Sequence, residues 1–248
     1  HIFLQTLAKR YGIWVSRPGN GIMHSIQMAR FGIPGKISLG TDSHTPTGGA
    51  IGMFAFGGGG MDGATAMAGL PIRLTMPEVV KVNLIGELRP GVAAKDVILE
   101  MLRRYSTKGG LGKVYEYVGE GIKTLDVPAR STITNMGAEL GATGSIFPAD
   151  ENVRRFFTAQ EREGDFIAYM PDEDAEYDSE IEINLSDLEP LIAIPDQPDN
   201  VVKVSELEKE PVHQVFFVSC TNGSYEDIAK VASVYKVRQV HENVSAVC

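Results

Sequence analysis

The stretch at residues 78–105, EVVKVNLIGELRPGVAAKDVILEMLRRY, decides the fold class. Its first half alternates apolar and polar residues, which is typical of a β-strand. Pro90-Gly91 then breaks the pattern. Beyond the break, apolar side chains recur at the i, i+3, i+4, i+7 spacing of an amphipathic helix over 94–105. A strand followed by such a helix predicts a layered α/β fold. The strand residues that share one face are Val80, Val82 and Leu84.

Segments on both sides of this unit repeat the alternation of strand and helix signals. Before it, the turn Pro18–Gly21 opens a helix that is apolar on several sides, so we expect that helix to be buried. A short strand at 37–39 follows. After it, a strand over 214–219 leads into a helix that begins at Ser224, where Asp227 completes a capping-box pattern. The whole chain therefore predicts α/β units in series.

Two segments between these units are typical of connectors. The acidic run 172–182 predicts a solvated loop, and the prolines within 190–198 predict a linker. We therefore place three units along the chain. They are a first α/β domain in 1–77, a second in 78–199 and the start of a third in 200–248.

The composition is that of a soluble globular chain, and its charge limits the partners. Of 248 residues, 43% are hydrophobic and 22% charged, as in ordinary globular domains. No apolar run approaches the roughly 20 residues that span a bilayer, so we expect no membrane partner. The net charge of -9 disfavours nucleic acid, which requires clustered Lys and Arg. Two cysteines form no disulfide framework and favour a reducing compartment, so we expect a cytoplasmic protein.

Three short motifs resemble known sites but lack an essential feature. Gly58–Gly63 fits the dinucleotide pattern, yet the glycine run makes the match nearly automatic and no convincing acid at a strand end follows about 20 residues on. Close backbone packing explains these glycines better. Gly109–Lys113 resembles a phosphate-binding loop, but Val114 stands where Ser or Thr is required. Asp42-Ser43-His44 holds the residue types of a hydrolase triad, but neighbouring side chains of an extended chain point apart.

Cys220 lies where the strand 214–219 ends and the next helix begins. Ligand sites of open α/β folds gather at the carboxyl ends of strands, and a helix N-terminus favours a thiolate. The alternative is a buried, inert cysteine. Cys220 is therefore a candidate ligand or nucleophile.

Two further groups of polar residues are candidates for chemistry. His24, Asp42 and His44 flank one predicted loop, and an imidazole beside a carboxylate can act as an acid or a base. Two satisfied structural histidines would be the alternative. Asn135 and Glu139 stand at i, i+4, which would put both on one helix face.

Four segments of the chain, taken in order, resemble the aconitase family, and the resemblance extends through nearly the whole chain. It implies three-layer α/β/α units like the first three aconitase domains. Because the chain begins at His1 and ends within an apolar alternation at Cys248, we expect an internal piece truncated at both ends. The four segments are Pro18–His24, Gly40–Gly49, Thr132–Thr143 and Ser219–Asp227.

The resemblance implies a hydro-lyase that interconverts citrate and isocitrate through cis-aconitate. The expected partner is a small tricarboxylate. The expected cofactor is a [4Fe–4S] cluster, with Cys220 as one of three thiolate ligands. The other two would come from a Cys-x-x-Cys outside this sequence, so the rest of the parent chain would complete the active site. Cys248 matches no ligand position of the family.

The resemblance also assigns roles to the candidate residues. His24 would pair with Asp42, and His44 with Glu139. A carboxylate behind an imidazole fixes its tautomer and raises its basicity. The two pairs would hydrogen-bond the hydroxyl group or water on the open iron of the cluster.

Two more residues complete the implied site. Ser43 would contact a substrate carboxylate, and Asn135 would lie near the cluster. Since other parts of the family's active site are outside this sequence, we expect the isolated chain to be inactive. Thr45–Gly49 resembles aconitases more than the 3-isopropylmalate or homoaconitate dehydratases. Those dehydratases, a cluster-free RNA-binding form of the fold and a NAD-binding module are the alternatives.

Overall fold

The centre of the structure is a four-stranded parallel sheet with strand order β5-β4-β3-β6. The computed structural model describes residues 2–248. Val80, Val82 and Leu84 of β3 are each at most 1% exposed and share the buried face, as the alternation predicts. The strands are β3 (Glu78–Ile85), β4 (Lys113–Val118), β5 (Gly144–Ile146) and β6 (Ser179–Asn184).

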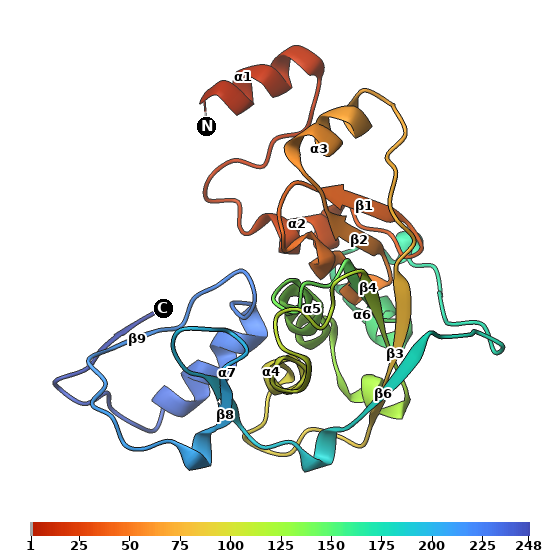
Figure 1. The fold of residues 1–248 in the computed structure, drawn as a ribbon. Coiled ribbons are helices and arrows are strands. Elements are labelled where there is room, and N and C mark those ends of the chain that lie inside the picture. The colour runs from red at the N-terminus through yellow and green to blue at the C-terminus, as the bar shows by residue number, and fades with distance from the viewer. Residues whose placement is uncertain (1) are drawn as a thin grey trace.

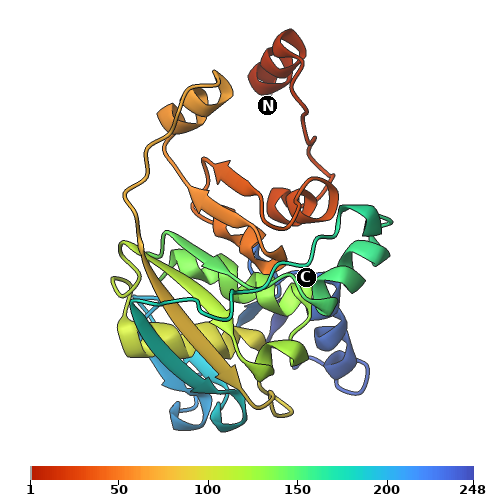
Figure 2. The same ribbon diagram turned by 90° about the vertical axis from the view of Figure 1, so that its right-hand side faces the viewer.

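Helices α4 (Ala94–Tyr105) and α5 (Val127–Asn135) cover that buried face (Figures 1 and 2). The helix predicted over 94–105 is confirmed, and Val97, Ile98 and Leu102 are fully buried against the sheet. Parallel strands joined through helices confirm the α/β fold class. The core on this face also includes Tyr117, whose ring stacks on Phe147 with centroids 4.7 Å apart.

The N-terminal part forms a smaller layer. Strands β1 (Ile37–Gly40) and β2 (Phe54–Gly57) are parallel and are joined through the 3₁₀ helix η1 (Thr45–Ile51). Helices α1 (Ile2–Tyr11) and α3 (Gly60–Met67) stand apart from the central sheet, at the top of Figure 1. The helix predicted after residue 21 is α2 (Met23–Arg30).

The expectation that α2 is buried on several sides is wrong. Only His24 and Met28 of this helix are buried, while Met23 at its start and Phe31 just after its end are about half exposed, at 52% and 50%. The reason is that α2 packs chiefly on η1, and Met28 joins the apolar cluster that η1 shares with α6, so the burial is confined to one side of the helix.

The two layers meet where η1 packs against β5 and α5. The backbone N–H of Phe147 donates to the carbonyl of Gly49 at 2.9 Å. A Cβ at position 49 would overlap the carbonyl oxygen of Ser145, so this close approach requires glycine. A second apolar cluster joins Met28 and Ile51 to helix α6 (Glu151–Ala159), so the N-terminal layer shares a core with later elements.

The start of α6 is tied to α5 by a buried ion pair. Arg130 is fully buried and donates two hydrogen bonds to Asp150, at 2.9 and 2.6 Å. Its remaining donors go to the carbonyls of Leu125, Ile122 and Pro148. Every donor direction of the guanidinium is thus used to hold α5 and α6 in one arrangement.

Two predictions about connectors are wrong in part. Within the acidic run 172–182, β6 begins at Ser179, because Ile183 is fully buried and β6 pairs with β3. Within the predicted linker, β7 (Leu191–Ala193) pairs with β8 (Val201–Lys203) in an antiparallel hairpin. That hairpin is anchored because Asp96 accepts a hydrogen bond from the N–H of Leu191 at 2.7 Å.

The C-terminal part contains β9 (Gln214–Phe216), α7 (Tyr225–Tyr235) and β10 (Ser245–Val247), with β9 and β10 parallel. The predicted strand over 214–219 ends early, at Phe216, where its pairing with Val247 of β10 stops. Ser224 and Asp227 exchange the hydrogen bonds of a capping box, which confirms that prediction. No helix within residues 2–248 has the length and apolar character to cross a bilayer.

Candidate active site

His24 and Asp42 form the first imidazole–carboxylate pair. Nε2 of His24, on α2, lies 3.1 Å from Oδ1 of Asp42, which follows the carboxyl end of β1. Burial lowers the pKa of His24, and the nearby charge of Asp42 opposes that effect only in part. The imidazole is therefore neutral near pH 7. Because a carboxylate only accepts, Nε2 of His24 carries the hydrogen and leaves Nδ1 as an acceptor.

His44 and Glu139 form the second pair. Nε2 of His44 lies 3.2 Å from Oε1 of Glu139, and Nδ1 lies 3.2 Å from Oγ of Ser43. The hydrogen-bond network assigns the tautomer, with Nε2–H donating to the carboxylate and Nδ1 accepting from the hydroxyl. The other carboxylate oxygen, Oε2 of Glu139, is buried and has no hydrogen-bond partner within residues 2–248.

The side chains of the neighbouring residues Ser43 and His44 contact each other. We expected neighbouring side chains to point apart, and for this pair that expectation is wrong. The chain bends here instead of extending, with the N–H of Thr45 donating to the carbonyl of Asp42 at 3.2 Å. No triad of consecutive residues results, because the nearest side-chain contact of Asp42 is with His24 and the acid bonded to His44 is Glu139.

The two pairs lie side by side. The ring centroids of His24 and His44 are 6.4 Å apart. A cavity of about 250 Å³ borders the first pair and is lined by His24, Asp42, Gln27 and Thr41 among others. Two imidazoles with fixed tautomers and two carboxylates thus occupy one small polar region next to a cavity, which is an arrangement able to accept, hold and donate protons.

Asn135 and Glu139 both contact the segment 44–47, Asn135 through Thr47 and Glu139 through His44. The expectation of one regular helix face is wrong, because α5 ends at Asn135 and a 3₁₀ turn, η3 (Met136–Ala138), follows. A Cβ at Gly137 would overlap Oγ of Ser145, so the turn packs tightly on β5. Asn135 is fully buried, and its Nδ2 donates to Oγ1 of Thr47 at 2.8 Å.

Cys220 is an exposed thiol in the loop after β9, so the alternative of a buried, inert cysteine is wrong. The next residue, Thr221, donates from Oγ1 to Oδ1 of Asn135 at 2.7 Å, and its carbonyl accepts from Thr132 at 3.0 Å. The Cys220 loop therefore docks on the end of α5 that also meets the loop after His44. Sequence reasoning missed Thr47 and Thr221, since nothing local marks a residue whose partner is 88 or 86 positions away.

A thiolate at position 220 fits one ligand of an iron–sulfur cluster. The sulfur is accessible, and its loop is attached to the polar end of α5. Residues 2–248 contain no group of three or more His, Cys, Asp or Glu side chains arranged to hold a metal. The described part of the chain can therefore supply one such ligand and cannot bind a three-thiolate cluster by itself.

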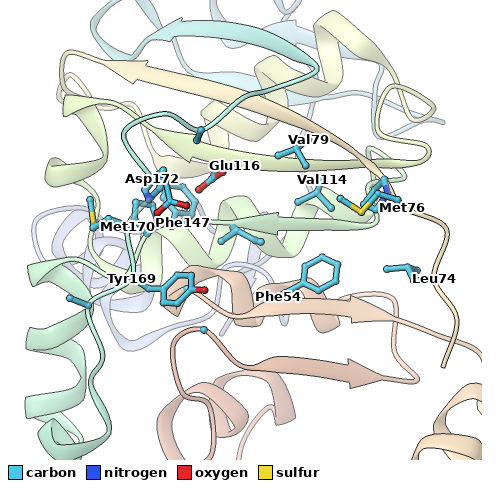
Figure 3. A pocket seen from close by; sticks show the side chains of 18 residues that line it. Phe54, Leu74, Met76, Val79, Val114, Glu116, Phe147, Tyr169, Met170 and Asp172 are labelled. Atoms are coloured by element: carbon cyan, nitrogen blue, oxygen red, sulfur yellow. The ribbon is translucent and has the colours of Figure 1, made fainter. Parts of the chain in front are cut away.

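A larger cavity lies elsewhere. It has a volume of about 800 Å³, and none of the seven predicted site residues lines it. Figure 3 shows Val79 and Val114 of the central sheet facing Phe54 of β2 across this space, with Glu116 and Asp172 toward one end. Burial raises the pKa of Glu116. The candidate chemistry therefore rests on the paired side chains and not on the size of a cavity.

The glycine motifs take up other roles. Helix α3 follows the glycine run, but Asp62 accepts from the N–H of Gly59 at 2.8 Å, so a carboxylate already occupies the helix N-terminus where a phosphate would bind. The turn at Gly109–Gly112 leads into strand β4, whereas a phosphate-binding loop leads into a helix. Both motifs are structural.

Comparison with known proteins agrees with these features. The model of the aconitase family (aconitate hydratase) matches residues 1–213. The chain is 42% identical to a mitochondrial aconitate hydratase of Arthroderma benhamiae, over 94% of this chain and 32% of that protein. It is also 42% identical to the 3-isopropylmalate dehydratase large subunit 2 of Archaeoglobus fulgidus, over 98% of this chain and 58% of that protein. A mitochondrial homocitrate dehydratase of Saccharomyces cerevisiae is 39% identical over 94% of this chain and 32% of its own length.

The chain thus spans about a third of the length of the fungal relatives and 58% of the archaeal subunit. The match to the family model covers most of the chain, and the four segments that carry the sequence resemblance contribute the two imidazole–carboxylate pairs, Asn135 and the Cys220 loop. This chain belongs to the aconitase family.

Proposed function

We propose that this chain forms part of the active site of a hydro-lyase that interconverts citrate and isocitrate through cis-aconitate. The observation that carries the proposal is the pairing of His24 with Asp42 and of His44 with Glu139, with the two rings 6.4 Å apart. The names of the similar proteins support a dehydratase, because they describe an aconitate hydratase, a 3-isopropylmalate dehydratase and a homocitrate dehydratase.

Dehydration of a hydroxy acid requires one group to remove a proton and another to assist departure of the hydroxyl group. In this proposal, Asp42 and Glu139 each hold the Nε2–H of an imidazole, which orients the ring and fixes its tautomer. Nδ1 of His24 is then free to accept a hydrogen bond from the departing hydroxyl group or the returning water. The exposed hydroxyl of Ser43 is placed to turn from Nδ1 of His44 to a substrate carboxylate.

The proposed cofactor is a [4Fe–4S] cluster with Cys220 as one thiolate ligand and Asn135 close by. When bound, such a cluster supplies an open iron that acts as a Lewis acid on the substrate hydroxyl. Two more ligands would come from the rest of a longer protein, so the isolated chain is expected to be inactive. Two free cysteines suit a reducing compartment such as the cytoplasm.

The second candidate substrate is 3-isopropylmalate. Its support is the archaeal large subunit, which is as similar in sequence as the aconitate hydratase and of which the chain covers a larger share. Assay of the full-length protein on citrate, 3-isopropylmalate and homocitrate separates the candidates. Turnover of citrate with the highest kcat/KM supports the first proposal, and exclusive turnover of another substrate overturns it.

Replacing His44 in the same protein tests the assigned chemistry. His44→Asn should reduce kcat by about 10²- to 10⁴-fold, which is the usual contribution of a positioned acid or base. An unchanged rate would remove His44 from the mechanism. A gel shift with RNA at several salt concentrations tests the regulatory alternative, and the net charge of -9 predicts no shift.

A further inference from the structure

The side chains of Thr47 and Thr221 bind opposite ends of one buried amide. Nδ2 of Asn135 lies 2.8 Å from Oγ1 of Thr47, and Oδ1 of Asn135 lies 2.7 Å from Oγ1 of Thr221. Asn135 is fully buried and Thr47 is 3% exposed. Three residues from distant parts of the sequence therefore form one hydrogen-bonded bridge at the end of α5.

The direction of each hydrogen bond in the bridge is determined by its neighbours. Oγ1 of Thr47 gives its only hydrogen to the carbonyl of His44, at 2.6 Å, and can only accept from Asn135. The amide must then turn Nδ2 toward Thr47 and Oδ1 toward Thr221, so Thr221 donates. The bridge runs one way, from the hydroxyl beside Cys220 to the backbone of His44, and such chains strengthen cooperatively.

The backbone on either side of the bridge is held to α5 as well. Oγ1 of Thr134 lies 3.2 Å from the carbonyl of Thr47 and 3.3 Å from that of Ser131, so its one hydrogen is shared between the two. Oγ1 of Thr132 donates to the carbonyl of Thr221 at 3.0 Å, while the carbonyl of Pro128 is farther away at 3.3 Å. The loop of His44 and the loop of Cys220 are thus both attached to one turn of helix. Their relative position depends on these contacts, since the two loops belong to different elements.

We propose that Thr47 and Thr221 are positioning residues, which act through Asn135 to hold the Cys220 loop in register with His44. Neither hydroxyl is needed for contact with substrate. This positioning would place the Cys220 thiolate relative to the imidazole–carboxylate pairs, and that role rests on the proposed function. The mechanical coupling of the two loops stands on the contacts alone.

The proposal depends on the hydroxyl groups and not on the shape of threonine. Valine has the same shape but would leave one end of the buried Asn135 amide without a partner, which is costly. Serine keeps the hydroxyl and loses only a methyl group. Thr→Val and Thr→Ser variants at either position therefore separate the hydrogen bond from packing.

Hydrogen–deuterium exchange of the full-length protein, as purified, tests the coupling. We expect Thr47→Val to accelerate amide exchange about fivefold in the Cys220 loop, the factor for one lost buried hydrogen bond. Thr221→Val should accelerate exchange in residues 42–47 by a similar factor. Thr47→Ser and Thr221→Ser should exchange like the unsubstituted protein. Thr158→Val is the control, because its hydroxyl bonds only within α6.

Exchange in β3 reports whether each variant is folded, and Thr221, which is half-buried, provides the milder variant if Thr47→Val fails to fold. Valine variants that change exchange only in their own loop, or serine variants that behave like valine, would overturn the proposal. The measurement requires no turnover. If the two loops are coupled but the protein has no hydro-lyase activity, the proposed function is wrong and the positioning role of the bridge stands. If the loops are uncoupled in an active enzyme, the positioning role is wrong and the proposed function stands.

Discussion

Nε2 of His44 lies 3.2 Å from Oε1 of Glu139, which joins a loop of the N-terminal layer to the turn after α5 across 95 residues of sequence. The contact gives the imidazole a fixed tautomer, with Nδ1 facing Ser43. Because His44 and Glu139 belong to different layers, the proposed chemistry depends on the correct packing of the two layers against each other.

Glu139→Gln tests the role of that carboxylate. The amide keeps the shape but cannot hold the Nε2–H tautomer with a full negative charge, so kcat of the full-length enzyme should fall about 10- to 100-fold. Glu173→Gln, in an exposed loop, is the control and should retain full activity. Equal rates for Glu139→Gln and the control would show that the carboxylate has no part in turnover.

The Arg130–Asp150 pair is predicted to stabilise the fold. Arg130→Met leaves Asp150 without its partner in a largely buried place, so the free energy of unfolding should fall by about 3–5 kcal/mol in urea titrations. Arg154→Met removes an exposed pair with Glu163 and should cost only about 0–1 kcal/mol. Similar losses in the two variants would contradict the assigned difference in burial.

Tyr115 and Tyr117 are both buried in β4, but loss of the hydroxyl group should affect the stability of the protein differently at the two positions. The hydroxyl of Tyr117 is buried with no partner within residues 2–248, so Tyr117→Phe should be neutral or stabilising. The hydroxyl of Tyr115 donates to the carbonyl of Gly109 at 3.0 Å, so Tyr115→Phe should destabilise by about 1 kcal/mol. Thermal unfolding of both variants measures the difference, and the reverse order would contradict it.

The sequence predicts the elements whose pattern is local. The strand with Val82, the helix over 94–105 and the cap at Ser224 all follow from spacing and side-chain chemistry within a few residues. Features that depend on distant partners were missed. The hairpin at Leu191 depends on Asp96, and its prolines suggested a linker instead.

The same division applies to the site. Motifs drew attention to His24, His44 and Cys220, because an imidazole beside a carboxylate and a cysteine at the carboxyl end of a strand can both carry chemistry. The bend that brings Ser43 to His44 is held by local hydrogen bonds to Asp42, which an extended-chain reading overlooks. The break of α5 after Asn135 goes with close packing of Gly137 on Ser145 of β5, which no local pattern records. The threonines of the bridge were missed for the same reason.

Burial of His24 predicts a pH dependence of stability. Its pKa in the folded protein is below the ordinary value of about 6.5, so between the two values the unfolded chain binds more protons. Stability should therefore fall as pH is lowered through about 6.5 toward the folded pKa. His24→Asn should flatten this part of the profile. A profile that is equally steep after His24→Asn would contradict the prediction.

The most direct test of the account compares two cysteine variants of the full-length protein. Both thiols are exposed in this chain, but only Cys220 belongs to the loop that docks beside Asn135. Cys220→Ser should abolish both the iron–sulfur absorption spectrum and hydro-lyase turnover after reconstitution with iron and sulfide, while Cys248→Ser should retain both. A Cys220→Ser protein that keeps its cluster and its rate would contradict the assignment of this chain to the site.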